Sequence, residues 1–184
     1  MKRKIIFLGA FNSRNNKNVI GGQLFASSSL LNSNLSKKYN FLKIDSTQRK
    51  IPPPNLIIRF FDAFVRILKL LYLILTNKIH CIIVFTSDGL GFLEKGLMII
   101  ISKKFNINTI LFPRSGLIIN DVKSKKFVFF LEKILKNTDV LIVQGNSWRS
   151  FYNQYVNEKT QIVVQQNWID VNKYLYPTRN FKNK

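Results

Sequence analysis

Residues 81–112 read CIIVFTSDGLGFLEKGLMIIISKKFNINTILF, and this stretch decides the fold. It contains two short apolar runs, at 81–85 and 109–112, on either side of a segment with helical apolar spacing at 92–104. Apart from Thr109, both runs are apolar instead of alternating with polar residues, which is typical of strands buried on both faces of a parallel sheet. The stretch therefore predicts a strand–helix–strand unit whose two strands are parallel.

The same alternation continues along the rest of the chain. Further strands are predicted at 5–8, 41–44, 140–143 and 161–164, and further helices at 21–39, 55–77, 123–136 and 147–156, the last capped by Ser147. We therefore expect an α/β fold with a doubly wound, Rossmann-like and mostly parallel sheet that carries helices on both faces. This domain is expected to span residues 1–172, followed by a basic tail or truncated interdomain linker at 173–184.

The composition is that of a globular protein with few metal-binding side chains. Of the 184 residues, 46% are hydrophobic and 13% aromatic, which is enough for one domain with a proper core. The single cysteine, Cys81, excludes an internal disulfide and a cysteine-based zinc site, and the single histidine, His80, excludes chemistry that needs a histidine pair. We expect no bound metal.

The chain has a large and diffuse excess of positive charge. It has 29 Lys and Arg against 9 Asp and Glu, a formal net charge of +20. Such a charge favours phosphates, anionic lipids or nucleic acid as partners, whereas the alternative is that an AT-rich coding sequence supplies lysine without any selection for binding. We expect no nucleic-acid partner, because the sequence has no helix-turn-helix pattern, no aromatic-bearing sheet motif and no compact basic stripe.

The N-terminus imitates a secretion signal. Its apolar run at 5–11 is too short for one, and the polar residues 12–17 follow in place of a small-residue cleavage site. The run is interpreted as a buried strand, and we expect a cytoplasmic chain.

The longest predicted helix, at 55–77, has two interpretations. Its charged residues Arg59, Asp62, Arg66 and Lys69 fall within one arc of about 80°, and they exclude a simple transmembrane span. The helix either covers the sheet or lies on a membrane, with Arg59, Arg66 and Lys69 near lipid phosphates. Its apolar arc is wider than a sheet-covering helix requires, which favours peripheral contact with the inner face of an anionic membrane.

Two of the loops that follow strands carry glycines at a predicted helix start. Gly21 and Gly22 precede a helix, where free N–H groups suit a phosphate, although two glycines also simply let a loop turn. Asp88 is placed to take a sugar hydroxyl, and Lys95 to approach a phosphate one turn further on. The alternative is that Ser87 or Asp88 only caps the helix.

The loop after the strand at 109–112 has the most chemical character. It places Arg114 and the hydroxyl of Ser115 beside Gly116 at the end of the sheet. The planar guanidinium suits a phosphate or a carboxylate. An ion pair with a local acid such as Asp121 is an equally good interpretation.

The order of these segments resembles the N-terminal domain of GT-B glycosyltransferases of the family 4 type. The resemblance covers roughly residues 2–175, and it lies in the order and spacing of the segments. The matching segments are Lys4–Gly9, Gly21-Gly22 up to Leu30, Ser87–Gly96, Phe112–Gly116, Asp139–Gln144 with Trp148, and Gln166–Asp170.

This resemblance implies a division of labour between two domains. The N-terminal domain would bind the acceptor, often a lipid-linked sugar at the membrane, and a second domain would bind the nucleotide-sugar through a pair of glutamates. Transfer would retain the anomeric configuration and need neither metal nor cofactor. By position, Gly21 and Gly22 would face the donor diphosphate, and the acceptor side would be lined by Asp88, Arg114, Ser115 and Gly116.

Two departures from the family pattern affect this expectation. Arg114-Ser115 stand where many relatives have a histidine, so no catalytic residue is assigned. The sequence also lacks the donor-binding glutamate pair, so we expect a separate donor-binding chain or a truncated reading frame, and little transfer by this chain alone. The alternative function is a non-catalytic docking or scaffold subunit of a transferase complex.

Overall fold

The structure is a computed structural model that describes residues 2–12, 22–48 and 54–167. The six strands are β1 (Arg3–Gly9), β2 (Tyr39–Asp45), β3 (Ile79–Thr86), β4 (Asn108–Pro113), β5 (Val140–Val143) and β6 (Gln161–Val164). They form one sheet in the order β2-β1-β3-β4-β5-β6, and every neighbouring pair is parallel. This confirms the predicted doubly wound, Rossmann-like α/β fold.

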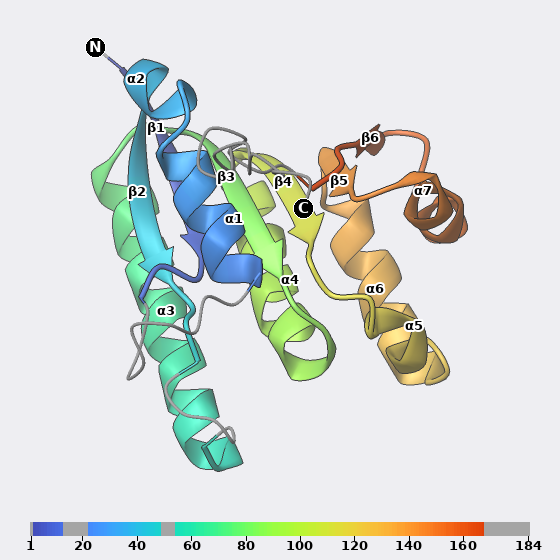
Figure 1. The fold of residues 1–184 in the computed structure, drawn as a ribbon. Helices are drawn as coiled ribbons and strands as arrows, with labels where there is room; N and C mark the ends of the chain where they lie inside the picture. Colours follow the sequence, from blue (N-terminus) through green and yellow to red (C-terminus); the bar gives the residue numbers. More distant parts are fainter. Residues whose placement is uncertain (1, 13–21, 49–53, 168–184) are drawn as a thin grey trace, which may run out of the picture.

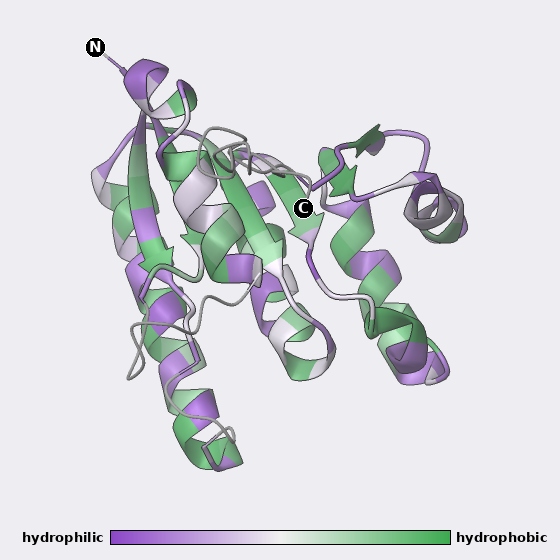
Figure 2. Cartoon of the chain, in the orientation of Figure 1, coloured by the Kyte–Doolittle hydropathy of each residue, from purple (hydrophilic) through white to green (hydrophobic). Residues whose placement is uncertain are grey.

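Helices lie on both faces of the sheet. They are α1 (Gly22–Leu31), α2 (Leu35–Lys38), α3 (Leu56–Thr76), α4 (Gly89–Lys104), α5 (Ile118–Asp121), α6 (Lys125–Lys136) and α7 (Asn146–Asn153). In Figure 1, α1 lies in front of the sheet, and α3, α4 and α6 lie behind it. The strands β3 and β4 between these layers are hydrophobic along most of their length (Figure 2), as expected for strands covered on both sides.

The strand order reverses at β1, which lies between β2 and β3. Ligands of such sheets bind in the crevice beyond the carboxyl ends of the strands at this reversal. Helix α1 approaches β1 closely there, because a Cβ added to Gly9 would lie 2.7 Å from Oγ of Ser27. A larger residue at the end of β1 would force the Ser27 side chain to move, so glycine favours the close packing of α1 on β1.

The two faces of the sheet have separate cores. The larger core lies between the sheet and the rear helices, and it includes Trp148 and Tyr152 of α7. The smaller core, on the α1 side, is a row of aromatic rings in which Phe85 contacts Phe7 and Phe112 edge to face, at centroid distances of 4.9 and 5.2 Å.

The boundaries of α3 agree with the prediction. Asn55 caps its first turn, since Oδ1 accepts a hydrogen bond of 3.1 Å from the N–H of Ile58, and Asn77 is the C-cap residue. In Figure 1 the N-terminal end of α3 continues well past the carboxyl ends of the strands. Among the described residues no helix combines the length and the apolar character needed to cross a membrane.

Four details of the helix prediction are wrong. The helix expected at 21–39 ends at Leu31, because the Ser33 hydroxyl bonds to the carbonyl of Leu30 at 2.7 Å and competes with the helical pattern. Ser147 is not a cap, since the N-cap residue of α7 is Gly145. Helix α4 begins at Gly89 instead of 92, and the short helix α5 was not predicted.

Candidate functional site

A polar pocket of about 140 Å³ lies at the carboxyl edge of the sheet, on the side of α3 and α4. We call it the edge pocket. It is lined by the loop after β2, the inner side of α3 and the first turns of α4. The residues in contact with it are Ser46, Thr47, Gln48, Pro54, Arg59, Asp62, Arg66, Ser87, Gly91, Glu94 and Lys95.

Lys95 is the buried charge of the edge pocket. Its exposed fraction is only 4%, and none of the described residues accepts a hydrogen bond from its ammonium group. Burial lowers the pKa of Lys95 to about 8, while the charge of Glu94 opposes this shift and that of Arg66 adds to it. The ammonium is therefore still mainly protonated at neutral pH, in a place that disfavours its charge.

An ion pair between the two helices forms the wall beside Lys95. Nε and Nη2 of Arg66 donate to the two carboxylate oxygens of Glu94 at 2.6 and 3.0 Å, and both side chains are 18% exposed. Such a bidentate pair fixes both side chains. Arg59 and Asp62 are half-buried on the same side of α3. Oγ of Ser46 is buried there and has no hydrogen-bond partner among the described residues.

Asp45, at the end of β2, stabilises the loops next to the edge pocket. Its carboxylate accepts hydrogen bonds from the N–H of Phe11 at 3.2 Å, from the N–H of Thr47 at 2.9 Å, and from the Asn12 amide. Burial alone would raise the pKa of Asp45. The hydrogen bond from the Thr47 hydroxyl, together with the bonds above, outweighs this effect and holds the pKa below its usual value. Asp45 thereby ties the loops after β1 and β2 together at the strand reversal.

Arg114 lies on the opposite, α1 side of the sheet edge. Its guanidinium stacks on the rings of Phe112 and Phe85, at 4.8 and 5.7 Å from their centroids. The backbone N–H of Arg114 donates to the carbonyl of Thr86 at 2.9 Å. Burial lowers the pKa of the guanidinium. Arg114 is not among the described residues that line the edge pocket with Lys95.

The neighbours of Arg114 shape the loop after β4. The Ser115 hydroxyl accepts a hydrogen bond from the N–H of Leu117 at 3.2 Å, which closes a local turn. Gly116 is exposed, and a Cβ there would lie 3.6 Å from the ring of Trp148. These two residues and Arg114 thus share one loop on the α1 side.

A carboxylate of α5 binds the backbone at the start of α4. Asp88 occupies the N-cap position, but its side chain makes no capping hydrogen bond. The N–H of Gly89, which has a positive φ of 53°, donates instead to Oδ2 of Asp121 at 2.7 Å. The carboxylate of Asp121, considered above as a partner of Arg114, therefore binds the backbone of α4.

The glycines predicted to face a phosphate lie at the start of α1. Gly21 lies outside the described residues. Gly22 is the first residue of α1, is exposed, and has open space where a Cβ would stand. The predicted site residues are therefore distributed over both sides of the carboxyl edge, with Lys95 on one side and Arg114 on the other.

Helix α3 turns its charges inward and its apolar residues outward. Arg59, Asp62 and Arg66 line the edge pocket, while Lys69 is exposed. The outer face, which we call the α3 apolar face, consists of large exposed side chains. They are Leu56, Ile57, Ile58, Phe60, Phe61, Phe64, Val65, Leu68, Tyr72 and Leu75, with exposed fractions from 41% to 79%.

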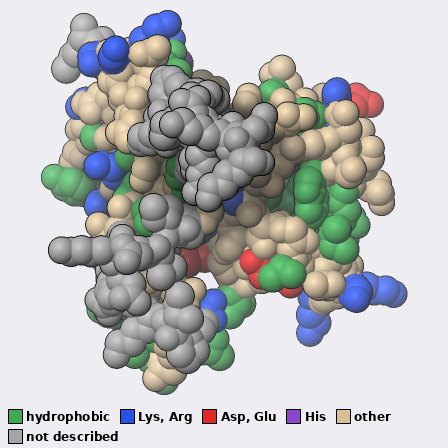
Figure 3. Space-filling model, in the orientation of Figure 1, with side chains coloured by type: hydrophobic (Ala, Val, Ile, Leu, Met, Phe, Trp, Pro, Cys, Tyr) green, Lys and Arg blue, Asp and Glu red, His purple; other side chains and the backbone are tan. Residues whose placement is uncertain are grey.

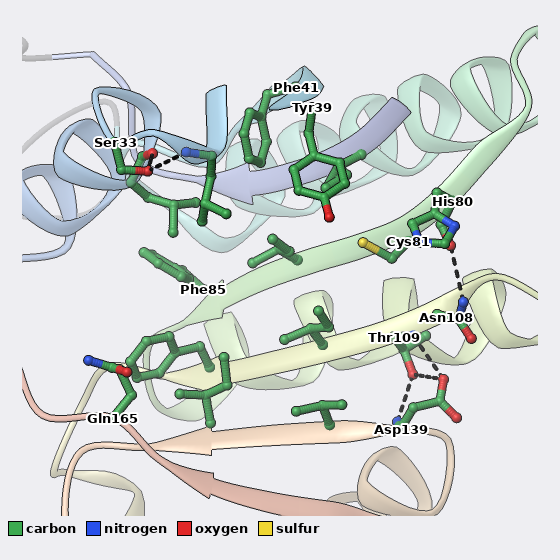
Figure 4. Close-up of a pocket in the computed structure, with 18 of the residues that line it drawn as sticks. Ser33, Tyr39, Phe41, His80, Cys81, Phe85, Asn108, Thr109, Asp139 and Gln165 are labelled. Atoms are coloured by element: carbon green, nitrogen blue, oxygen red, sulfur yellow. Dashed lines mark hydrogen bonds between the residues drawn. The ribbon is translucent and has the colours of Figure 1, made fainter. Parts of the chain in front are cut away.

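A larger, apolar groove of about 670 Å³ lies over the α1 side of the sheet. Side chains from β1 to β5 line it, and Figure 4 shows polar residues such as His80, Asn108 and Asp139 at the ends of the strands. Cys81 lies in this groove, and burial raises the pKa of its thiol to about 11, so the thiol is not activated as a nucleophile. The described residues include no cluster of three His, Cys, Asp or Glu that could hold a metal ion.

Sequence reasoning missed the loop after β2 and Glu94. The sequence candidates come from the loops after the strands at 5–8, 81–85 and 109–112, although Ser46 and Thr47 also follow a predicted strand. The charges are also widely spread. Lys and Arg side chains occupy several separate places on the face shown in Figure 3, so charge density alone does not single out the pocket.

A scan against models of protein families finds no match, and a search of curated proteins finds no significant match.

Proposed function

We propose that this chain is the acceptor-binding domain of a glycosyltransferase that works at a membrane surface. The acceptor would be a sugar carried by a lipid, and a separate domain would bring the nucleotide-sugar for a retaining transfer. One observation carries the proposal: α3 has its apolar face outside and its charged residues in the edge pocket. A single helix thus joins an apolar environment to a polar site, which is the arrangement that an amphiphilic acceptor requires.

The size of the α3 apolar face favours a lipid bilayer as its partner. The helix has 21 residues and is therefore roughly 32 Å long. Phe60 and Ile57 on this face are 76% and 79% exposed. Helices that lie in a membrane interface combine such a face with flanking cations, here the exposed Lys69. The net charge of +20 adds attraction to anionic lipids, and we place the chain at the cytoplasmic face of the membrane.

The carboxyl edge of the sheet supports the binding of a sugar or a phosphate. Doubly wound sheets bind ligands at this edge. On the α1 side, the stacked guanidinium of Arg114 can bind a phosphate or a carboxylate, with Ser115 and Gly116 in the same loop. Gly22, at the exposed start of α1, would face the donor. Asp88, at the start of α4, would contact the acceptor.

Transfer requires both substrates to be held in register, which supplies roughly 7–11 kcal/mol of the barrier. We therefore expect no turnover when this chain alone is mixed with radiolabelled nucleotide-sugars and a lipid extract. Robust transfer by the isolated chain would contradict the division of labour. No metal or cofactor is proposed for the domain itself.

Membrane binding can be measured by sedimentation with vesicles of phosphatidylcholine and phosphatidylglycerol. Replacing Phe60 and Phe64 together by serine removes two exposed rings from the α3 apolar face. We expect at least a tenfold loss of vesicle binding, since burying one such side chain contributes about 1.5–3 kcal/mol. The matched control replaces Phe129 and Phe130, two exposed rings on α6, by serine. Equal binding of both double variants would exclude α3 as the membrane contact.

A non-catalytic docking subunit is the second candidate, and the α3 apolar face alone would suffice for it. Replacing Arg114 by alanine separates the two candidates. The acceptor-binding proposal expects membranes from cells that express this variant to lose most of their sugar transfer, while the chain stays on the membrane. Full transfer by the variant would favour the docking subunit.

A further inference from the structure

The position of Lys95 needs an explanation that the fold does not supply. The side chain is 4% exposed, and its ammonium has no hydrogen-bond partner among the described residues, although it borders the edge pocket. A buried charge normally has a hydrogen-bonded partner of opposite sign. The neighbouring carboxylate of Glu94 gives both its oxygens to Arg66. The ammonium therefore faces a polar cavity without a direct acceptor.

The lining of the edge pocket favours an anion over a cation. It contains three cationic side chains, Arg59, Arg66 and Lys95, against two carboxylates, Asp62 and Glu94. One of these carboxylates is fully engaged by Arg66. A metal ion would need free carboxylate oxygens, whereas an oxyanion needs donors, and donors are what the pocket offers.

The donors of the pocket suit a tetrahedral oxyanion. They come from different elements: Lys95 from α4, Arg59 from α3, and the buried hydroxyl of Ser46 from the loop after β2. Their convergence from three elements matches the several acceptor oxygens of a phosphate better than the two oxygens of a carboxylate. The cavity of about 140 Å³ exceeds the ~30 Å³ share of one water molecule several times, so it also has room for the group.

We propose that the edge pocket binds a phosphate group of the acceptor, with Lys95 as its buried cationic anchor. The inference deepens the proposed function, and it rests on that function only for the identity of the molecule that carries the phosphate. The same chemistry is offered by a free phosphate monoester and by a lipid headgroup. Because α3 forms one wall of the pocket and also carries the α3 apolar face, a headgroup in the membrane surface can reach the pocket.

The first experiment titrates the full chain with inorganic phosphate and follows the heat of binding. We expect binding by the wild type and at least a tenfold weaker binding by Lys95→Met, which keeps the length of the side chain. The matched control is Lys69→Met, because Lys69 is an exposed lysine of α3. It should bind phosphate like the wild type. Circular dichroism and urea unfolding confirm that each variant is folded. Equal phosphate binding by the wild type and Lys95→Met, or none by either, would overturn the inference.

The second experiment identifies the source of the phosphate. Phosphatidylcholine vesicles carry either phosphatidic acid, a phosphate monoester, or phosphatidylglycerol, a diester, adjusted to equal surface charge. If the group belongs to a lipid, the wild type prefers phosphatidic acid and Lys95→Met loses this preference. If free phosphate binds but the wild type shows no preference, the phosphate is that of a soluble molecule, and the pocket assignment stands.

The two experiments keep this inference apart from the proposed function. The Phe60→Ser/Phe64→Ser variant leaves the lining of the pocket intact and should titrate with phosphate like the wild type. Phosphate binding by a wild type that ignores all vesicles would remove the membrane role and leave the pocket. Vesicle binding by a wild type that does not bind inorganic phosphate would remove the pocket and leave the membrane role.

Discussion

Replacing Lys95 by methionine is expected to stabilise the fold by about 3 kcal/mol at pH 7. Burial lowers the pKa of Lys95 from 10.5 to about 8 in the folded chain. One pKa unit corresponds to about 1.4 kcal/mol, so the folded state carries a cost of that size whenever lysine is protonated in both states. Methionine fills the same volume without a charge and removes the cost.

The sign of the pH dependence follows from the same shift. Below pH 8 the folded and unfolded chains both bind the proton, and the full cost is present. Between pH 8 and 10.5 the unfolded chain binds more protons than the folded one, so the stability that depends on Lys95 rises with pH. The advantage of the methionine variant therefore shrinks across this window and disappears above it.

Urea unfolding of both chains at pH 7 and at pH values above 8 measures the effect. The control is Lys69→Met, whose exposed position predicts a change within about 0.5 kcal/mol at either pH. A methionine variant no more stable than the wild type at pH 7, or one whose advantage does not depend on pH, would show that the ammonium is well solvated in the fold.

The stability cost and the proposed phosphate binding have the same cause, the buried ammonium group of Lys95. A bound anion supplies a hydrogen-bond acceptor for the Lys95 ammonium, which none of the described residues provides. It therefore stabilises the folded chain by an amount that grows with the ratio of its concentration to its dissociation constant. Methionine gains stability and loses the anion, a trade-off expected of binding residues. The wild type should therefore unfold at a higher temperature in phosphate buffer than in an uncharged buffer of equal ionic strength, and Lys95→Met should not.

The fold was largely predictable because the relevant signals are local. The strands at 140–143 and 161–164 are apolar except for Gln161 and are flanked by polar residues, and the structure has them at these bounds. Helix α3 begins after Asn55 and ends before Asn77, its two cap residues, so its bounds follow from the local sequence. The helix predicted at 21–39 ends early because the Ser33 hydroxyl donates a hydrogen bond to the carbonyl of Leu30, which is an equally local effect.

The arrangement of the candidate site depends on contacts between elements, and the sequence does not reveal these. The sequence of α3 shows that its apolar and charged residues lie on different sides of the helix. Which side faces the rest of the protein depends on whether a neighbouring element offers an oppositely charged residue. That residue is Glu94 on α4, whose carboxylate binds Arg66 and keeps the charged side inside. The sequence likewise does not show that Arg114 and Lys95 lie on opposite sides of the sheet. The side on which Arg114 lies follows from its packing on Phe112.

Replacing Gly96 by valine is expected to destabilise the fold by about 2–3 kcal/mol. A Cβ at this position would lie 2.2 Å from Cδ1 and 2.6 Å from Cγ1 of Ile134 on α6. Ile134 is 2% exposed and belongs to the larger core, so its side chain has little room to move aside. Helix α4 would have to shift away from α6, and α4 is the helix that holds Lys95 in the edge pocket.

A double-mutant cycle tests whether this contact is the cause. Ile134→Ala alone leaves a cavity and costs about 2–5 kcal/mol, but it also makes room for the valine. The double variant should therefore be more stable than the sum of the two single changes predicts, by about 1–2 kcal/mol. Gly22→Val is the matched control, because a Cβ at Gly22 meets nothing within 4 Å and should change stability little. Strict additivity in urea unfolding would mean that α4 and α6 are not in contact at Gly96, and that another element sets the position of Lys95.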